Sequence, residues 1–236
     1  NVANFAMDEV RQLVLRPILR DGLLTAEGDV WKRSRKAMAP VFTPRHARGF
    51  ARQMLLKSEE FAERFDTGEA EGTVRDIAAD MTALTYLILS ETLFSGEIAT
   101  EGQDVAADVD ALLHHMGRID PLDMLAAPAW LPRLTRIGGR QVLAKFRALV
   151  RSTMEKRKAA ISRDPQSAPR DFLTLLLEVE GPQGLSTEEI EDNILTFIGA
   201  GHETTARALA WTLYCVANSP TIRTAMETEF DSVLKD

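Results

Sequence analysis

Apolar residues recur at three- and four-residue intervals along most of the chain, and no segment alternates as a surface β-strand does. Gly, Pro, Ser and Asp residues separate these periodic segments. The pattern predicts a mainly α fold, one domain over residues 1–236, with helices over 4–20, 28–36, 43–67, 74–94, 100–116, 138–161, 171–180, 186–219 and 220–235. Residues 117–135, rich in Pro and apolar groups, are expected to form a loop with short helical pieces.

We expect the fold to be organised around the helix over residues 186–219. Ser186 and Glu189 have the spacing of a capping box, which begins a helix, and Pro220 cannot continue one. The length between these signals gives a helix of about 45–50 Å, enough to cross a whole domain. Its apolar residues surround much of the helix, as in a helix buried in a core: Ile190, Ile194, Phe197, Ile198, Leu209, Leu213 and Val216.

The middle of this helix departs from that pattern. Gly199 and Gly201 each cost about 1 kcal/mol relative to Ala in a helix, and the polar residues 202–205 follow directly. Without side chains at the two glycines, a flat ligand can approach the backbone closely. The Thr204 hydroxyl can donate to the Ala200 carbonyl one turn earlier, which loosens and bends the helix and leaves a pocket beside it.

Glu203 places a carboxylate beside this pocket, where it can pass protons inward from solvent. A structural interpretation also stays open, in which Gly-x-Gly only admits a neighbouring backbone and Glu203 forms a solvated ion pair with Arg207. A zinc-protease interpretation fails, because position 206 is Ala where that motif needs a second His. The adjacent His114 and His115 do not indicate a metal site either, because neighbours on a helix point about 100° apart.

A basic segment is the second candidate binding region. Residues 30–52 contain seven Lys or Arg and no Asp or Glu, although the whole chain carries a net charge of −7. Trp31 and Arg35 share a helical face, so an indole N–H and a guanidinium can jointly bind one anionic group. Lys32 and Lys36 share the adjacent face. A solvated basic face with Trp31 as a core anchor is the structural alternative.

The segment Ala200-Gly201-His202-Glu203-Thr204-Thr205 resembles the distal-helix motif of the cytochrome P-450 haem-thiolate monooxygenases: a small residue, Gly, any residue, an acid, Thr, then Thr or Ser. Its flanks, DNILTFIGAGHETTARALAW, are similar to the family too. Trp31 and Arg35 resemble the family's Trp-x-x-x-Arg helix. The resemblance covers essentially the whole chain, and it implies a cytochrome P-450-like helical domain built around one long central helix.

The resemblance implies a haem-dependent monooxygenase with haem b as cofactor. Electrons from NAD(P)H would arrive through a ferredoxin- or flavoprotein-type donor, and one atom of O2 would enter a small apolar substrate. The resemblance further implies that Thr204 hydrogen-bonds dioxygen, that Glu203 relays protons to it, and that Ala200 and Gly201 leave room above the haem ring. It implies that the substrate pocket is lined by Phe197, Ala200 and Thr205. It also implies that Trp31 and Arg35 bind a haem propionate and that Lys32, Arg33 and Lys36 face the redox partner. In the loop, Leu122, Met124, Leu125 and Trp130 would shape specificity, although core packing explains them equally well.

The proximal part of such an enzyme is not found in the sequence. The family's iron is held by a Cys thiolate. Cys215 is not that ligand, because it lies eleven residues beyond Thr204 on one helix, about 16 Å away, and lacks the family's Gly-rich loop. The family's Glu-x-x-Arg element is absent too. We therefore expect the chain to be the middle of a longer enzyme, truncated at both ends, with no metal ligand of its own and inactive in isolation.

Composition narrows the remaining choices. The negative net charge opposes nucleic-acid binding, and the single cysteine allows no internal disulfide and favours a reducing, cytoplasmic location. Uninterrupted apolar runs are roughly half as long as a membrane span requires. We also expect the protein to be a monomer. Two other functions stay open. One is a peroxide-using or isomerising haem-thiolate enzyme, which the Glu203-Thr204 pair disfavours, and the other is a non-catalytic helical binding module.

Overall fold

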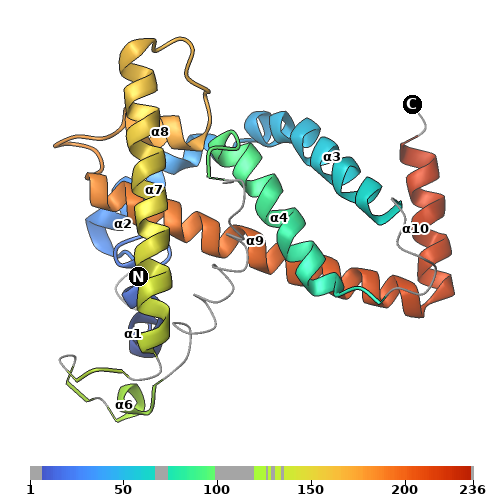
Figure 1. The fold of residues 1–236 in the computed structure, drawn as a ribbon, viewed down its shortest axis with the longest axis horizontal. Helices are drawn as coiled ribbons and strands as arrows, with labels where there is room; N and C mark the ends of the chain where they lie inside the picture. The colour runs from blue at the N-terminus through green and yellow to red at the C-terminus, as the bar shows by residue number, and fades with distance from the viewer. Residues whose placement is uncertain are drawn as a thin grey trace.

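The computed structural model describes residues 7–66, 74–98, 120–125, 127–128, 131–133 and 136–234 (Figure 1). Within these residues no β-strand is assigned, and Glu180 and Leu185 form an isolated bridge. The predicted mainly α fold is confirmed. The elements in chain order are α1 (Glu9–Leu19), α2 (Gly28–Met38), the 3-10 helix η2 (Ala39–Phe42), α3 (Pro44–Asp66), α4 (Ile77–Phe94), α6 (Pro121–Met124), α7 (Ile137–Arg163), α8 (Phe172–Glu178), α9 (Thr187–Asn218) and α10 (Pro220–Val233).

Helix ends lie at or near the predicted positions. Pro44 is the first residue of α3, as predicted. The α4 helix begins at Ile77, three residues after the predicted start at 74, because the Asp76 carboxylate accepts a hydrogen bond from the Ala79 N–H at 3.1 Å. The predicted helix over 100–116, with its two histidines, lies outside the described residues, and so does Trp130.

The long helix α9 is capped as predicted. The Glu189 N–H donates to Ser186 Oγ at 3.1 Å, and the Ser186 N–H donates to Glu189 Oε2 at 2.8 Å. At the other end Ser219 caps α10, whose first residue is Pro220. The helix stays continuous through residues 199–205, and the predicted bend beside Thr204 stays a prediction.

The other helices are arranged around α9 (Figure 1). α7 crosses its N-terminal half, α4 packs along its middle, and α10 turns away at its C-terminal end. The main hydrophobic cluster lies where α4, α7, α8 and the N-terminal half of α9 meet, and includes Phe94, Val150, Phe172, Leu176, Ile190, Ile194 and Ile198. This cluster fixes the first half of α9 in place.

The second half of α9 is much less buried than the sequence predicts. Leu209 and Leu213 are 36% and 43% exposed, so the prediction that apolar groups are buried along the whole helix is wrong there. On α3 the apolar residues Phe50, Met54, Leu55, Phe61 and Phe65 recur at spacings that predict one buried side, but Met54 and Leu55 are exposed. Periodicity identifies an apolar face, but it does not show whether a neighbouring element covers that face.

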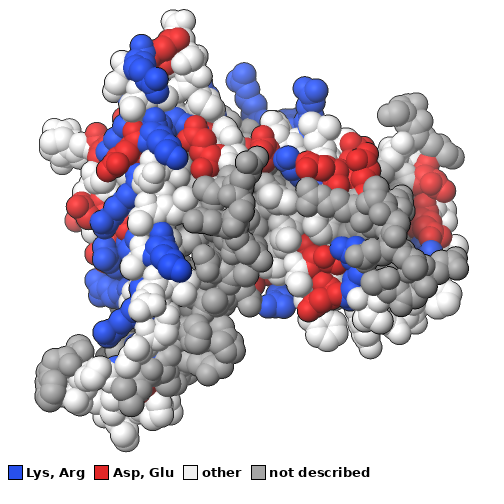
Figure 2. Space-filling view, viewed as in Figure 1, with Lys and Arg blue, Asp and Glu red and all other residues white. Residues whose placement is uncertain are grey.

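The α7 helix carries Lys and Arg side chains along its surface, as Figure 2 shows. The charged run Glu155-Lys156-Arg157-Lys158 in the sequence predicts a solvated basic end for this helix, but Arg157 is buried. Arg157 has no exposed side-chain area. Its guanidinium donates to Asp171 Oδ1 at 2.6 Å, and to Thr174 Oγ1 at 2.7 Å, and lies 2.9 Å from Glu97 Oε1. The placement of Arg157 on a solvated basic end is therefore wrong.

The turn after α1 contacts α9 so closely that only Gly fits at position 22. A Cβ built on Gly22 would overlap Thr196 Oγ1 and lie 2.6 Å from the carbonyl oxygen of Asp192. We expect Gly22→Ala to lower the free energy of unfolding by about 1–3 kcal/mol, because α9 backbone must shift. Urea unfolding of the full-length protein measures this change.

Gly49 on α3 is the matched control for Gly22. A Cβ there meets no atom within 4 Å, so Gly49→Ala should raise the free energy of unfolding by about 0.5–1 kcal/mol through helix propensity. Equal effects of the two substitutions would contradict the close approach of the turn to α9.

By length and composition alone, α4 could also cross a membrane. Half of its 18 residues are buried inside the protein, and core helices of soluble proteins pass the same test. The finding is therefore weak support for a membrane span in the part of the chain that was searched.

Candidate functional site

The segment of α9 around residue 200 has one face packed against α4. Ile198, His202 and Ala206, four residues apart, are buried on this face. His202 Nδ1 lies 2.6 Å from the Ile198 carbonyl oxygen, so this nitrogen carries the proton and donates it. The ring meets Tyr86 edge-on at 6.0 Å between centroids, and burial raises the pKa of Tyr86. Position 202, where the motif allows any residue, therefore has a packing role here.

The two glycines of the segment serve different purposes. A Cβ on Gly201 would lie 2.5 Å from Leu89 Cδ1, so Gly201 lets α4 approach α9. Thr85 Oγ1 of α4 donates to the His202 carbonyl at 3.0 Å across the same contact. A Cβ on Gly199 meets no atom within 4 Å. The structure thus gives Gly201 a helix-packing role against a side chain, not against a neighbouring backbone as the structural interpretation of Gly-x-Gly predicts, and leaves space beside Gly199.

The neighbouring face of α9 is open. Ala200, Thr204 and Thr205 are exposed on it. Thr204 Oγ1 donates to the Ala200 carbonyl at 2.8 Å, as predicted, and Thr205 Oγ1 donates to the Gly201 carbonyl at 3.1 Å. Each hydroxyl keeps acceptor capacity, and its single proton can turn from the backbone carbonyl to a ligand. The face therefore presents two small hydroxyl groups beside a methyl group.

Glu203 lies next to this face and is half-buried. Its Oε1 is 3.8 Å from Arg207 Nη2, with side-chain exposures of 34% and 50%. An ion pair so long and so accessible contributes little to stability, and it opens easily. The solvated pair of the structural interpretation is thus present, and it leaves the carboxylate able to exchange protons with water.

Phe197 borders the open face one turn before Ala200. Its ring lies between two others, 5.4 Å from Phe42 of η2 and 4.6 Å from Phe172 of α8. The structure therefore holds Phe197 in an aromatic cluster. The predicted role of Phe197, Ala200 and Thr205 as substrate-pocket residues stays a prediction.

On α2, Trp31 and Arg35 share a face as predicted. The guanidinium carbon lies 6.0 Å from the centre of the indole ring, and both residues are exposed. Within the described part of the chain Arg35 makes no ion pair. An indole N–H and an unneutralised guanidinium at the surface form a donor set suited to a carboxylate.

The three other cations of α2 differ in their surroundings. Lys32 lies 3.1 Å from Asp29 in a highly exposed pair, and Lys36 is exposed. Arg33 contacts Glu189 at 2.6 Å, so it binds the first turn of α9. The structure therefore leaves Lys32 and Lys36 more accessible to a partner than Arg33.

Asn193 joins α2 and the preceding turn to α9, and sequence reasoning missed it. The fully buried amide donates to Ser34 Oγ at 3.2 Å and to the Glu189 carbonyl at 2.7 Å, and its Oδ1 accepts from the Leu23 N–H at 2.8 Å. Asn193 follows Glu191 and Asp192 in a polar stretch of α9, so the sequence gives no sign that its amide is buried. The contact positions the Trp31–Arg35 helix relative to α9.

A buried ionic network beside Asn193 was also missed. Arg147 of α7 contacts Glu191 at 2.5 Å and Asp192 at 2.8 Å, and Arg151 contacts Glu191 at 2.6 Å. Burial raises the pKa of Glu191, but hydrogen bonds from Arg151 and Arg147 outweigh burial and hold the pKa below its usual value. Burial also raises the pKa of Asp192, and the Arg147 hydrogen bond offsets only part of that rise.

Cys215 is exposed and free. It lies on α9 with Thr204, at the helical separation that the sequence indicates. The described residues contain no group of three or more His, Cys, Asp or Glu arranged to hold a metal ion.

Comparisons with known proteins agree with one another. Residues 3–236 match the family model described as Cytochrome P450. The chain is 30% identical over 226 residues to Putative cytochrome P450 132 of Mycobacterium tuberculosis (strain ATCC 25618 / H37Rv), covering 90% of this chain and 47% of that protein. It is 27% identical over 228 residues to Cyclooctatin synthase of Streptomyces melanosporofaciens, covering 93% and 47%.

The structural comparison gives the same result. The crystal structure of cytochrome P450DA heme domain superposes with a TM-score of 0.74 at 25% identity, covering 94% of this chain and 48% of that chain. The chain thus spans about half the length of the relatives that it matches.

Proposed function

The chain belongs to the cytochrome P450 family, and we propose that it is part of a haem-dependent monooxygenase that inserts one atom of O2 into a small apolar organic substrate. The open face of α9, where the Thr204 hydroxyl is bonded to the Ala200 carbonyl, carries this proposal. Because the chain spans about half of its relatives, the activity is proposed for the whole protein.

Haem b fits the residues that the structure describes. The exposed guanidinium of Arg35 and the indole of Trp31 form a donor set for a propionate. The open face of α9 presents the Ala200 methyl group and the small Thr204 and Thr205 side chains, which leave room for the flat side of a macrocycle. When bound, haem supplies the activation of O2, a reaction for which amino-acid side chains have no equivalent.

The side chains of α9 supply protons and shape. The proton of the Thr204 hydroxyl can turn from the Ala200 carbonyl toward a bound O2 molecule. Glu203 then supplies a replacement proton from solvent. Thr205, Ala200 and Phe197 border the substrate, with Phe197 held in place by the rings that it contacts.

We propose that electrons come from NAD(P)H through a ferredoxin- or flavoprotein-type donor that contacts the basic side of α2. Lys32 and Lys36 are its main contacts, because Arg33 is occupied by Glu189. We further propose a cytoplasmic, monomeric enzyme, since the single cysteine, exposed and free, suits a reducing compartment.

The proposal is tested on the full-length protein in two steps. A haem titration should give a Soret band that shifts with carbon monoxide as a thiolate-ligated haem does. Incubation with NADPH, a redox partner, ¹⁸O2 and a panel of apolar compounds should then give a product carrying one ¹⁸O atom, detected by mass spectrometry. Absence of haem binding would favour a non-catalytic helical module, and ¹⁸O-free rearranged products would favour an isomerising enzyme.

A further inference from the structure

Three consecutive backbone carbonyls of α9, at residues 200–202, accept hydrogen bonds from threonine hydroxyls. The first two accept from Thr204 and Thr205 of the same helix, at 2.8 and 3.1 Å. The third, that of His202, accepts from Thr85 Oγ1 of α4 at 3.0 Å. In an α-helix each of these carbonyls is also the acceptor for the N–H group four residues later, so each has two donors.

A carbonyl that serves two donors holds each of them less firmly. Hydroxyl groups that bond helix carbonyls slightly destabilise and bend helices, and a side chain that inserts into the backbone ladder from outside causes local bending. The N–H of Ala206 depends on the His202 carbonyl, so its bond competes with a donor from another helix. The ladder is therefore weakened in the turn that carries Glu203 and Thr204.

The neighbours of Thr85 hold it against α9. Thr85 is 6% exposed. Leu89, one turn further along α4, lies so near Gly201 that a Cβ on that glycine would be 2.5 Å from Leu89 Cδ1, and the ring of Tyr86 meets the ring of His202 edge-on. These contacts fix α4 beside α9, so the Thr85 hydroxyl stays next to the His202 carbonyl.

The single hydroxyl proton of Thr85 has three acceptors within reach. Thr85 Oγ1 lies 2.8 Å from the Met81 carbonyl oxygen, 3.2 Å from that of Thr82 and 3.0 Å from that of His202. A carbonyl oxygen only accepts, so the contact with His202 is favourable while the proton points toward it. When the α9 turn moves away, the Met81 carbonyl accepts the same proton. The hydroxyl can thus follow a movement of α9 without becoming a buried, unpaired donor.

We propose that Thr85 is a positioning residue for proton delivery at the Thr204 face. Its hydroxyl weakens the bond between the Ala206 N–H and the His202 carbonyl, and thereby gives Glu203 and Thr204 freedom to turn toward a ligand. In this role Thr85 acts through the α9 backbone and not by contact with the substrate. The inference rests on the proposed monooxygenase function and adds a residue of α4 to it.

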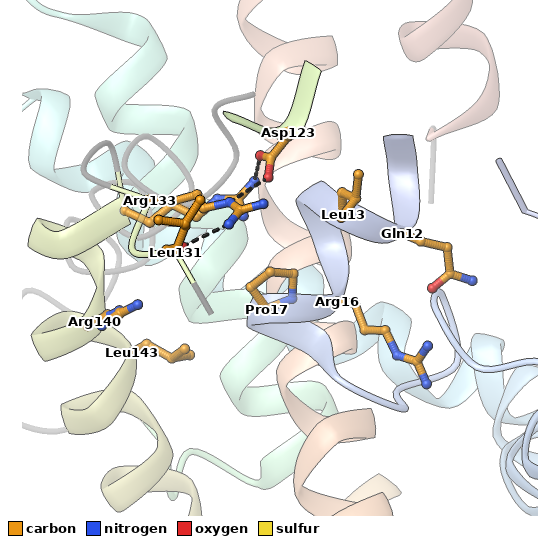
Figure 3. Close-up of a pocket in the computed structure, with 10 residues that line it drawn as sticks. Gln12, Leu13, Arg16, Pro17, Asp123, Leu131, Arg133, Arg140 and Leu143 are labelled. Atoms are coloured by element: carbon orange, nitrogen blue, oxygen red, sulfur yellow. Dashed lines mark hydrogen bonds and ion pairs between the residues drawn. The ribbon is translucent and has the colours of Figure 1, made fainter. Parts of the chain in front are cut away.

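Thr82, three residues earlier on α4, is the matched control. It is 8% exposed, and its hydroxyl donates to the Ala78 carbonyl at 2.8 Å, which is the same local bond that Thr85 makes to Met81. Among the described residues its side chain makes no hydrogen bond to α9. Figure 3 shows a cavity beside α1, and neither threonine lines it, so substitutions at 82 and 85 leave that lining unchanged.

The first test measures amide hydrogen exchange in the full-length, haem-loaded protein, by mass spectrometry of peptides that cover residues 203–208. Thr85→Val removes the hydroxyl and keeps the shape of the side chain. Exchange of the Ala206 N–H should then slow about fivefold, the effect of removing one competing hydrogen bond. Thr82→Val should leave the exchange rate unchanged. Faster exchange in Thr85→Val, or an equal effect of the two substitutions, would overturn the proposal.

The second test measures product formed per NADPH in the same variants. Thr85→Val should lower it about two- to fivefold, since one hydrogen bond is lost and Thr204 keeps its own hydroxyl. Thr85→Ser, which restores the hydroxyl, and Thr82→Val should both match the wild type. If Thr204→Ala lowers product per NADPH and Thr85→Val does not, the role of Thr85 fails alone. If neither substitution lowers it, proton delivery from this face of α9 fails as well.

Discussion

Replacing Thr204 with Ala in the full-length, haem-loaded enzyme should separate electron consumption from product formation. The wild-type Thr204 hydroxyl donates to the Ala200 carbonyl at 2.8 Å on the open face of α9. Complete turnover needs two electrons and two protons per O2, giving product and water. Without a positioned proton donor, the electrons should leave as hydrogen peroxide. Positioned proton transfer contributes about 10²–10⁴-fold, so we expect product per NADPH to fall roughly tenfold or more.

Thr212→Ala is the matched control for Thr204→Ala. Thr212 is exposed on the same helix and donates to the Ala208 carbonyl at 2.8 Å, so its loss makes the same local change without touching the proposed site. Product, peroxide and NADPH are measured together for both variants. If the two variants couple electrons to product equally well, Thr204 has no specific role in proton delivery. A Thr204→Ser variant should retain coupling, because it keeps the hydroxyl.

The helices and their ends were predictable because they depend on neighbours in sequence. Ser186 and Glu189 satisfy each other's backbone N–H groups wherever the helix lies, and Pro220 ends it for a reason internal to its ring. The predicted single-domain organisation rests on no such local signal, and it stays a prediction.

Burial was less predictable, because it depends on elements distant in sequence. Arg157 lies in a run of charged residues that predicts an exposed position, yet it is buried because its partners lie 14 residues later at Asp171 and 60 residues earlier at Glu97. Leu209 and Leu213 read as core, yet they are exposed among the described residues. Charge or periodicity alone does not specify which segment lies opposite a given face.

In the candidate site, too, the features that depend on helical spacing were predictable and those that depend on distant elements were not. The Thr204–Ala200 hydrogen bond and the shared face of Trp31 and Arg35 follow from helical spacing, and the structure confirms both. The difference between Gly199 and Gly201 depends on where Leu89 of α4 lies, so no sequence pattern contains it. The catalytic and binding roles of these residues stay predictions, because they concern ligands.

The largest expected effect on stability comes from Arg157. The fully buried guanidinium donates to both carboxylate oxygens of Asp171, at 2.6 and 2.9 Å, and Asp171 also accepts from Ser95 Oγ and from the Thr174 N–H that begins α8. Burial lowers the pKa of Arg157, but the bonds to Asp171 and Glu97 outweigh burial and hold the pKa above its usual value. The cation therefore stays charged across the working pH range.

Arg157→Leu removes the cation and leaves the Asp171 carboxylate buried beside it. Removing one partner of a buried pair costs about 3–5 kcal/mol, so urea unfolding of the full-length protein should show a loss of that size. Arg163→Leu, on the same helix but exposed, should change stability by less than about 0.5 kcal/mol. Adding Asp171→Asn to Arg157→Leu should recover part of the loss, because the amide carries no charge and still offers an oxygen to the Thr174 N–H. Equal destabilisation by Arg157→Leu and Arg163→Leu would mean that the Asp171 pair does not hold α7 to α8.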